Sequence, residues 1–390
     1  MKKALIVLLL LAFVAGGLFA QFSFAGRVDS GLAIFKSSAT DSKVSYGSIA
    51  KQTDAGAVTR GEVDFNATKE GGQAGIVIRL RVDAVNMADG SAFNLRHAYG
   101  WLKVLDGLLE VRGGRFSGTN YDTFDALSDG ASLCGGSGNA YGFQTYIKPI
   151  DILSFGVGAK YNTTRQGLAV NGPTFKDNFA GWFGLGLAMP DLMGLNVQMD
   201  FGRDNVNFQF SWRLLAVKNL TVIVTGRFLD LTEFSDVGQM WFYEQFGFTG
   251  IKNLTLGLGL VEALNKAPAN DAFYFSGVVW AAYALNGGKI IPRLDVAFGV
   301  NGPYTINDFY FNNFIAGAGS FLDKDRPDNS NMGFITFTPS VKFQVMNNCF
   351  FDVGFFGGID IGDVSAFHTA APTTDTGFNW GIFTSLYVRF

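Results

Sequence analysis

The chain has 390 residues, of which 40 are Phe and 50 are Gly; only 16% are charged, and the formal net charge is −3. A hydrophobic content of 48% excludes a disordered chain, and two cysteines are too few for a disulfide-stapled scaffold. The slightly acidic balance argues against a nucleic-acid partner, which would require a basic patch.

The start of the chain has the pattern of a secretory signal peptide. Lys2 and Lys3 form a positive start, an apolar run covers residues 4–19, and Ala20 offers a cleavage point, with Ala25 as the alternative. We therefore expect residues 1–20 to be a signal peptide and residues 21–390 to form one exported domain.

After the leader, apolar and polar side chains alternate at every second position. In residues 206–212, for example, Val206, Phe208 and Phe210 alternate with Asn207 and Gln209. Side chains of a strand point alternately to its two faces, so such segments predict strands with one apolar and one polar face. No run of residues beyond the leader approaches the roughly 18 apolar residues of a spanning helix, whereas a tilted membrane strand needs only about 9–11. The pattern favours a transmembrane antiparallel β-barrel that is apolar outside and polar inside. A soluble all-β sandwich, with its apolar face turned inward, is the alternative.

The connectors between these segments fall into a short and a long class that alternate along the chain. The short connectors are residues 69–73, 105–107, 148–151, 190–194, 217–219, 250–253, 286–289 and 347–348. The long connectors are residues 37–57, 118–139, 162–177, 231–237, 301–331 and 362–377, with shorter exceptions at 86–92, 202–205 and 265–271. This asymmetry is typical of outer-membrane barrels, whose periplasmic turns are short and whose external loops are long. The connectors predict about eighteen strands; sixteen is the alternative, because residues 306–317 fit either a strand or a folded loop.

The last predicted strand carries a second signature. Ile382, Leu386, Val388 and Phe390 share one face, and Phe390 is the final residue. This pattern resembles the C-terminal signal by which bacterial outer-membrane proteins are recognised by their assembly machinery. We therefore expect Phe390 to act as an assembly signal.

Several segments in the first third resemble one family. They are residues 59–63 (TRGEV), 69–72 (KEGG), 74–78 (AGIVI), 95–102 (LRHAYGWL), 111–116 (VRGGRF) and 121–122 (YD). In order and spacing they are similar to the second to fifth strands and the start of the third loop of Gram-negative general porins. The resemblance covers roughly residues 22–165.

The resemblance implies a trimeric diffusion channel whose third loop, here residues 118–139, folds inward and narrows the pore. Arg60 and Arg96 match arginines of the barrel wall in that family, and Arg115 matches the arginine that follows the glycine of the fifth strand. The loop would supply acidic groups, here Asp122, Asp125 and Asp129. It departs from the family because it is shorter and lacks the Pro-Glu-Phe-Gly-type tip.

Alternation alone places charged groups on the inside of the barrel. Arg79 and Arg81 share a face with Asp83, as Arg60 does with Glu62. A charged group facing lipid at mid-membrane costs about 2–4 kcal/mol for Arg or Lys, so these faces should be luminal. Facing rows of opposite charge would sort solutes by charge. Alternatively, the charges only solvate a wide interior.

The fifth predicted strand leaves one choice open. Arg115 shares a face with Val111, whereas Arg112 shares the opposite face with Glu110, so Arg112 is the luminal candidate unless a bulge intervenes. Arg112 therefore joins Arg115 among the pore-lining candidates.

Neither histidine has the sequence context of a catalytic or metal-binding residue. His97 shares a face with Leu95, Tyr99 and Trp101, so we expect it at the rim or in a subunit interface. His368 likewise has no recognisable partner set for nucleophilic catalysis. We expect no enzyme activity, no metal and no cofactor.

The sequence thus predicts an outer-membrane porin that passes small hydrophilic solutes and ions passively, embedded in lipid as a homotrimer. The alternative is a non-channel surface barrel that acts as an adhesin or structural protein through its long loops. A barrel that binds a sugar or peptide is also possible, and an aromatic track along the lumen would point to it.

Overall fold

The structure is a computed structural model that describes residues 20–36, 45–48, 59–83, 94–117, 139–162, 179–201, 206–229, 231, 239–267, 270–300, 332–362 and 378–389. The expected signal peptide lies outside these residues, except that the first strand begins at Ala20. The expected cleavage therefore stays a prediction.

The described residues form antiparallel strands joined at one end by short turns, two of which are single 3-10 turns, η1 (Leu105–Gly107) and η3 (Asn286–Gly288). The strands are β1 (Ala20–Lys36), β2 (Ser45–Ser48), β3 (Thr59–Lys69), β4 (Ala74–Asp83), β5 (Asn94–Val104), β6 (Leu109–Ser117), β7 (Asn139–Ile150), β8 (Leu153–Asn162), β9 (Phe179–Met189), β10 (Met193–Phe201), β11 (Val206–Leu214), β12 (Leu220–Leu229), β13 (Gln239–Ile251), β14 (Leu254–Ala267), β15 (Asn270–Tyr283), β16 (Ile290–Val300), β17 (Met332–Met346), β18 (Cys349–Gly362) and β19 (Phe378–Arg389). Among the described residues, no helix is long and apolar enough to cross a membrane.

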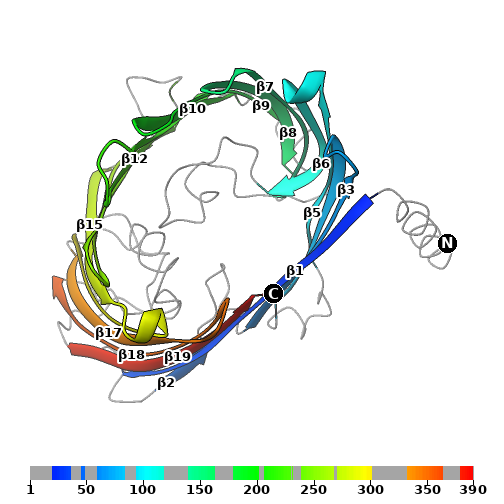
Figure 1. The fold of residues 1–390 in the computed structure, drawn as a ribbon. Coiled ribbons are helices and arrows are strands. Elements are labelled where there is room, and N and C mark those ends of the chain that lie inside the picture. The colour runs from blue at the N-terminus through cyan, green and yellow to red at the C-terminus, as the bar shows by residue number, and fades with distance from the viewer. Residues whose placement is uncertain are drawn as a thin grey trace, which may run out of the picture.

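The pairing pattern closes the sheet into a ring, which Figure 1 shows along its axis. β1 pairs with β3 on one side and with β19 on the other, and every strand from β3 to β19 pairs with its neighbours in sequence. The ring therefore contains eighteen strands of the described chain, which confirms the predicted antiparallel barrel and its strand number. Residues 306–317 lie outside the described part, and so does the expected inward loop, residues 118–139, except for Asn139, which begins β7.

β2 is the one short strand that the sequence did not predict. Residues 37–57 were expected to form a connector, but Ser45–Ser48 pair with Leu32 to Phe35 of β1. β3 pairs with β1 only as far as Ser30, so β2 continues the pairing along the same edge of β1. The extra length of β1 explains why a piece of the connector becomes a strand.

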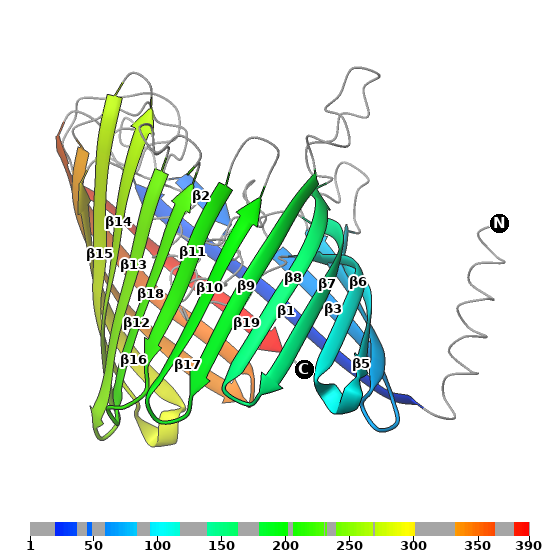
Figure 2. The ribbon, with the colours of Figure 1, turned by 90° about the horizontal axis from the view of Figure 1, so that it is seen from above.

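The short turns all lie at one end of the tilted strands, which Figure 2 shows in side view. Each of the eight predicted short connectors falls between two paired strands. Several of the turns contain Asn or Asp in the left-handed region, with φ of 60° at Asp191, 63° at Asn219 and Asn253, and 61° at Asn348. Asn and Asp tolerate this conformation better than other non-glycine residues, which explains the repeated Lys-Asn in two of the turns.

Burial is inverted relative to a soluble protein. Large apolar side chains point outward, with Phe24 exposed by 60% and Val157 by 52%. Buried side chains include many polar ones, among them Gln198 and Thr225, each exposed by only 1%. A sandwich would bury its apolar face, so the inversion confirms the barrel that is apolar outside and polar inside.

Aromatic rings packed on glycines form part of the wall itself. Trp182 lies across from Gly158, Trp280 across from Gly257, and in each pair a Cβ on the glycine would collide with the indole ring. Both tryptophans are on the inner face and are buried, so they fill the wall. Glycine thus provides the space in which a large ring can lie flat against the neighbouring strand. This pairing accounts for part of the high Gly and aromatic content.

Candidate functional site: the polar inner wall

Cross-strand register determines which polar side chains meet on the inner face. Along one row, Trp101 of β5 pairs with Arg112 of β6, which pairs with Gln144 of β7. Paired residues lie on the same face of a sheet, with Cβ atoms about 4.5–5.5 Å apart. The hydrophobic pattern pins this register, because a slip by one residue would turn the charged groups toward lipid.

The first charged pair joins β3 to β4. The guanidinium of Arg79 donates from Nε to Oδ1 of Asp64 at 2.5 Å and from Nη2 to Oδ2 at 2.7 Å. Two parallel bonds of this kind satisfy both oxygens and fix the geometry. Glu62 and Arg81 are the next register pair on the same face, and both are buried.

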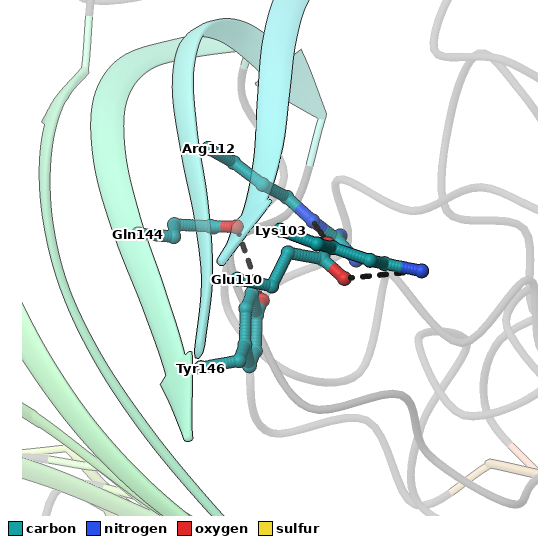
Figure 3. Close-up of polar contacts among 5 residues, drawn as sticks. All are labelled: Lys103, Glu110, Arg112, Gln144 and Tyr146. Carbon is teal, nitrogen blue, oxygen red and sulfur yellow. Dashed lines mark hydrogen bonds and ion pairs between the residues drawn. The ribbon is translucent and has the colours of Figure 1, made fainter. Parts of the chain in front are cut away.

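A second group lies beside the turn between β5 and β6 (Figure 3). We call Lys103, Glu110 and Arg112 the Glu110 cluster. Arg112 donates from Nε to Glu110 at 2.5 Å, and the ammonium of Lys103 lies 3.8 Å from the other carboxylate oxygen. The carboxylate of Glu110 therefore interacts with two cations.

Aromatic rings and an amide border this cluster. Lys103 lies 5.3 Å from the centroid of Trp101, and Arg112 lies 4.9 Å from that of Tyr146. These are cation–π distances. The hydroxyl of Tyr146 donates to Oε1 of Gln144 at 3.0 Å. The two rings thus hold the two cations against the wall, and the amide of Gln144 holds Tyr146 in place.

Together, the inner charged residues of β3 to β6 form what we call the charged arc. Its described members are Glu62, Asp64, Arg79, Arg81, Lys103, Glu110 and Arg112. Four cations face three carboxylates, so this part of the wall has a formal surplus of one positive charge.

Strands β10 to β12 line the interior with mostly neutral polar groups, which we call the amide arc. Its members are Gln198, Asp200, Gln209, Ser211 and Thr225. Gln198 donates to Asp200 at 2.6 Å, and the hydroxyls of Ser211 and Thr225 lie 3.0 Å apart. All five are buried; the bond from Gln198 to Asp200 lies within β10, and the contact between Ser211 and Thr225 joins β11 to β12.

A third group of charges occurs on β16 to β18. Arg293 donates from Nε to both oxygens of Asp295, at 2.9 and 2.8 Å, and lies 5.4 Å from the centroid of Trp280. Lys342 and Asp352 are a register pair on neighbouring strands. The sequence analysis missed these residues, although the alternation of Arg293 and Asp295 around one outward residue is the same signal that identified Arg79 and Arg81.

The structure places three of the pore-lining candidates on the inner wall, namely Arg79, Arg81 and Arg112. Arg115 pairs with Ala98, on the face opposite to that of Arg112, so the register favours Arg112 as the luminal residue of β6. The side chains of Arg60 and Arg96 lie outside the described part, and so do Asp122, Asp125, Asp129 and Phe390. Their roles stay predictions.

His97 is placed differently from what the sequence suggested. It pairs with Arg79, whereas Leu80 pairs with Leu95, so Arg96 is an extra residue in a β-bulge. The bulge separates the faces of His97 and Leu95. His97 therefore lies on the inner face with Tyr99, which does not agree with a place in a subunit interface on the outer face.

Within the described residues, no group of three or more His, Cys, Asp or Glu side chains is arranged to hold a metal ion.

Neither a known family profile nor a curated protein sequence matches this chain. Solved structures do. The anion-selective porin from Comamonas acidovorans aligns over 95% of this chain and 100% of its own, with 13% identity and a TM-score of 0.51. OccK2 (OpdF) from Pseudomonas aeruginosa covers 95% of this chain and 97% of its own, with 10% identity and a TM-score of 0.55. The outer membrane protein opdK from Pseudomonas aeruginosa covers 95% and 99%, with 11% identity and a TM-score of 0.54. The chain thus has the fold of a porin-type outer-membrane β-barrel.

Proposed function

We propose that this protein is an outer-membrane porin, a water-filled channel through which small hydrophilic solutes and ions diffuse passively and without catalysis. The observation that carries the proposal is the polar inner wall, which is charged on β3 to β6, mostly neutral on β10 to β12 and charged again on β16 to β18. Polar groups need water or a hydrogen-bonding partner, so such a wall suits an interior that holds water.

The charges support weak ion selectivity of the described wall. In the charged arc, Arg79 is paired with Asp64, and four cations against three carboxylates leave one positive charge among its described members; on β16, Arg293 is paired with Asp295. The porin resemblance alone supports two further parts of the proposal. These are a homotrimeric assembly and a narrowing by residues 118–139, in which Asp122, Asp125 and Asp129 face Arg60 and Arg96.

Planar-bilayer recording of the purified, folded protein tests the proposal. We expect discrete conductance steps in potassium chloride, with a sample of the same protein unfolded by heat as the control. A folded barrel that inserts but gives no steps would contradict the porin proposal and favour a surface adhesin or structural protein.

A further inference from the structure

We propose that an apolar groove on the outer face of β12 to β16 holds one acyl chain of an anionic phospholipid, whose phosphate is bound by lysines of the adjoining turns. The inference goes beyond the channel function, because the groove lies on the wall that faces lipid and does not depend on conduction. The short turns of outer-membrane barrels face the periplasm, so the lipid would come from the periplasmic leaflet.

The groove is a hollow in the outward wall with a volume of about 360 Å³. We call it the outer groove and define it by six residues, Leu220, Phe248, Leu256, Val279, Ala281 and Leu294. Val279 is 49% exposed and Leu294 is 47% exposed, which places them on the outer face. Ala281 pairs with Leu256 on one side and with Leu294 on the other. A methyl group thus stands between two larger side chains, which hollows the surface.

The turns beside the outer groove carry positive charge without acidic neighbours. The connectors at residues 217–219, 250–253 and 286–289, which we call the basic turns, contain Lys218, Lys252 and Lys289 and no Asp or Glu. The connectors at residues 69–73, 105–107, 148–151 and 190–194 contain two lysines and four acidic residues, namely Lys69, Lys148, Glu70, Asp106, Asp151 and Asp191. The ring of turns therefore has three positive charges beside the groove and a net charge of −2 (2 − 4) across these four connectors.

Backbone hydrogen bonds fix the basic turns next to one another at one end of the strands (Figure 2). The carbonyl of Asn219 accepts from the N–H of Thr249 at 2.9 Å, and the carbonyl of Asn253 accepts from the residue after β15 at 2.8 Å. Lys218 and Lys252 immediately precede these asparagines, and both are exposed. Successive hairpins are two strand spacings apart, about 10 Å, and the lysine ammonium is carried on a flexible four-carbon stem. Two neighbouring lysines can therefore approach one phosphate.

The outer groove lies at the depth expected for the chain of a lipid whose phosphate is at the turns. β14 begins at Leu254, and Leu256 and Leu258 of that strand line the groove. At about 3.4 Å per residue, they lie about 7 and 14 Å along the strand from its start. The strands of such barrels are tilted by about 35–45°, so the depth in the membrane is smaller than these lengths. The groove thus begins directly below the level of the headgroups.

The charge and the groove together select a lipid over other occupants. Two copies of the chain that met through this same face would bring the lysines of both together, and like charges at an interface repel. A free phosphate ion would use the lysines but leave the apolar groove uncovered. An anionic phospholipid supplies a partner for both, since anionic lipid headgroups attract basic segments.

The test measures phospholipid bound to the full folded barrel by native mass spectrometry from detergent micelles. We expect phosphatidylglycerol to bind more tightly than phosphatidylcholine with the same acyl chains, which has no net charge. Lys252→Gln should weaken phosphatidylglycerol binding about five-fold, the effect of one lysine near an anionic lipid surface. Lys148→Gln is the matched control, because Lys148 is an exposed lysine beside a turn that also contains Asp151.

Ala281→Leu tests the outer groove separately from the lysines. The larger side chain fills the space between Leu256 and Leu294 and leaves the charge of the turns unchanged, so binding of phosphatidylglycerol should fall at least as much as in Lys252→Gln. Ala159→Leu is the control, because Ala159 of β8 faces outward beside Phe143, away from the groove. Heat-dependent gel mobility checks that each variant is folded.

Each contrary outcome removes a different part of the inference. If phosphatidylglycerol and phosphatidylcholine bind equally, or if Lys252→Gln and Lys148→Gln bind phosphatidylglycerol equally, the basic turns do not hold the headgroup. If Ala281→Leu dissociates an oligomer without releasing lipid, a second copy of the chain covers the groove. If inorganic phosphate displaces the lipid completely, the lysines bind a free ion. None of these outcomes bears on conduction, which the planar-bilayer recording tests.

Discussion

The charged arc and the amide arc line the same interior, yet they satisfy their polar groups by different means. In the charged arc, ion pairs such as Asp64 with Arg79 cross between strands. In the amide arc, the pairs are mostly neutral, as between Ser211 and Thr225. Both walls are polar, but charged groups predominate in the charged arc, whereas Asp200 is the one charged member of the amide arc. The comparison teaches that a water-facing wall requires polarity, whereas charge is an additional property that can act on solutes.

The seam between the arcs gives the largest expected effect. Trp182 is 1% exposed and packs on Gly158, between Gln144 and Asp200 in the same register row. Trp182→Ala should lower the free energy of unfolding by about 3–5 kcal/mol, because it leaves a cavity in the wall. Urea unfolding in lipid vesicles measures this change.

Phe183 provides the matched control for this prediction. It is the next residue in β9, but it faces outward and is 49% exposed. Phe183→Ala should cost much less than Trp182→Ala, since its ring has little protein around it. If Trp182→Ala and Phe183→Ala lower the free energy of unfolding equally, the packing of Trp182 in the wall adds no stability beyond that of an outward-facing ring.

Removing one charge from the charged arc should give an intermediate effect on stability and a change in selectivity. Asp64→Asn weakens the double hydrogen bond to Arg79, and hydrogen bonds to charged groups contribute about 1.5–3 kcal/mol. The inner wall also gains positive charge, so the reversal potential in a potassium chloride gradient should shift toward anions. Ser211→Ala in the amide arc should leave the reversal potential unchanged. If Asp64→Asn and Ser211→Ala shift the reversal potential by the same amount, the charged arc does not act on ions differently from the amide arc.

The smallest effect is expected within the amide arc. Ser211→Ala and Thr225→Val should each lower the free energy of unfolding by about 1 kcal/mol, since each removes the hydrogen bond between the two buried hydroxyls. The double variant should cost less than the sum, because both polar groups are then gone. A double-mutant cycle in urea gives the coupling, and strict additivity would mean that the two hydroxyls do not interact.

Much of the barrel could be predicted because its rules are local. Alternation predicted the inner face of β4, and the short connector at residues 69–73 fixes a hairpin in which Asp64 pairs with Arg79. In the structure β3 ends at Lys69 and β4 begins at Ala74, and equal steps back from these two residues bring Asp64 opposite Arg79. The pairing of Lys342 with Asp352 does not follow in this way, because a register shift between Gln344 and Met346 moves it by one residue from the count that starts at the turn of residues 347–348.

The remaining features depend on contacts that are distant in sequence. β16 pairs with β17 across residues 301–331, so the approach of Arg293 to Ser340 could not be counted from a turn. The bulge at Arg96 adds one residue to β5, and nothing in a pattern of period two marks its position. β2 depends on the unpaired end of β1, which is a property of the folded sheet.

The pairing of β1 with β19 has a consequence for the order of folding. It joins Arg27 to Arg389, which are 362 positions apart (389 − 27). Contacts of such long range form slowly, because a very large loop must close first. Until β19 is in place, β1 and β18 each keep an open edge that can pair with other chains. A growing barrel of this kind is therefore most prone to aggregation just before its final strand joins, so protection of those two edges should govern the yield of folded protein.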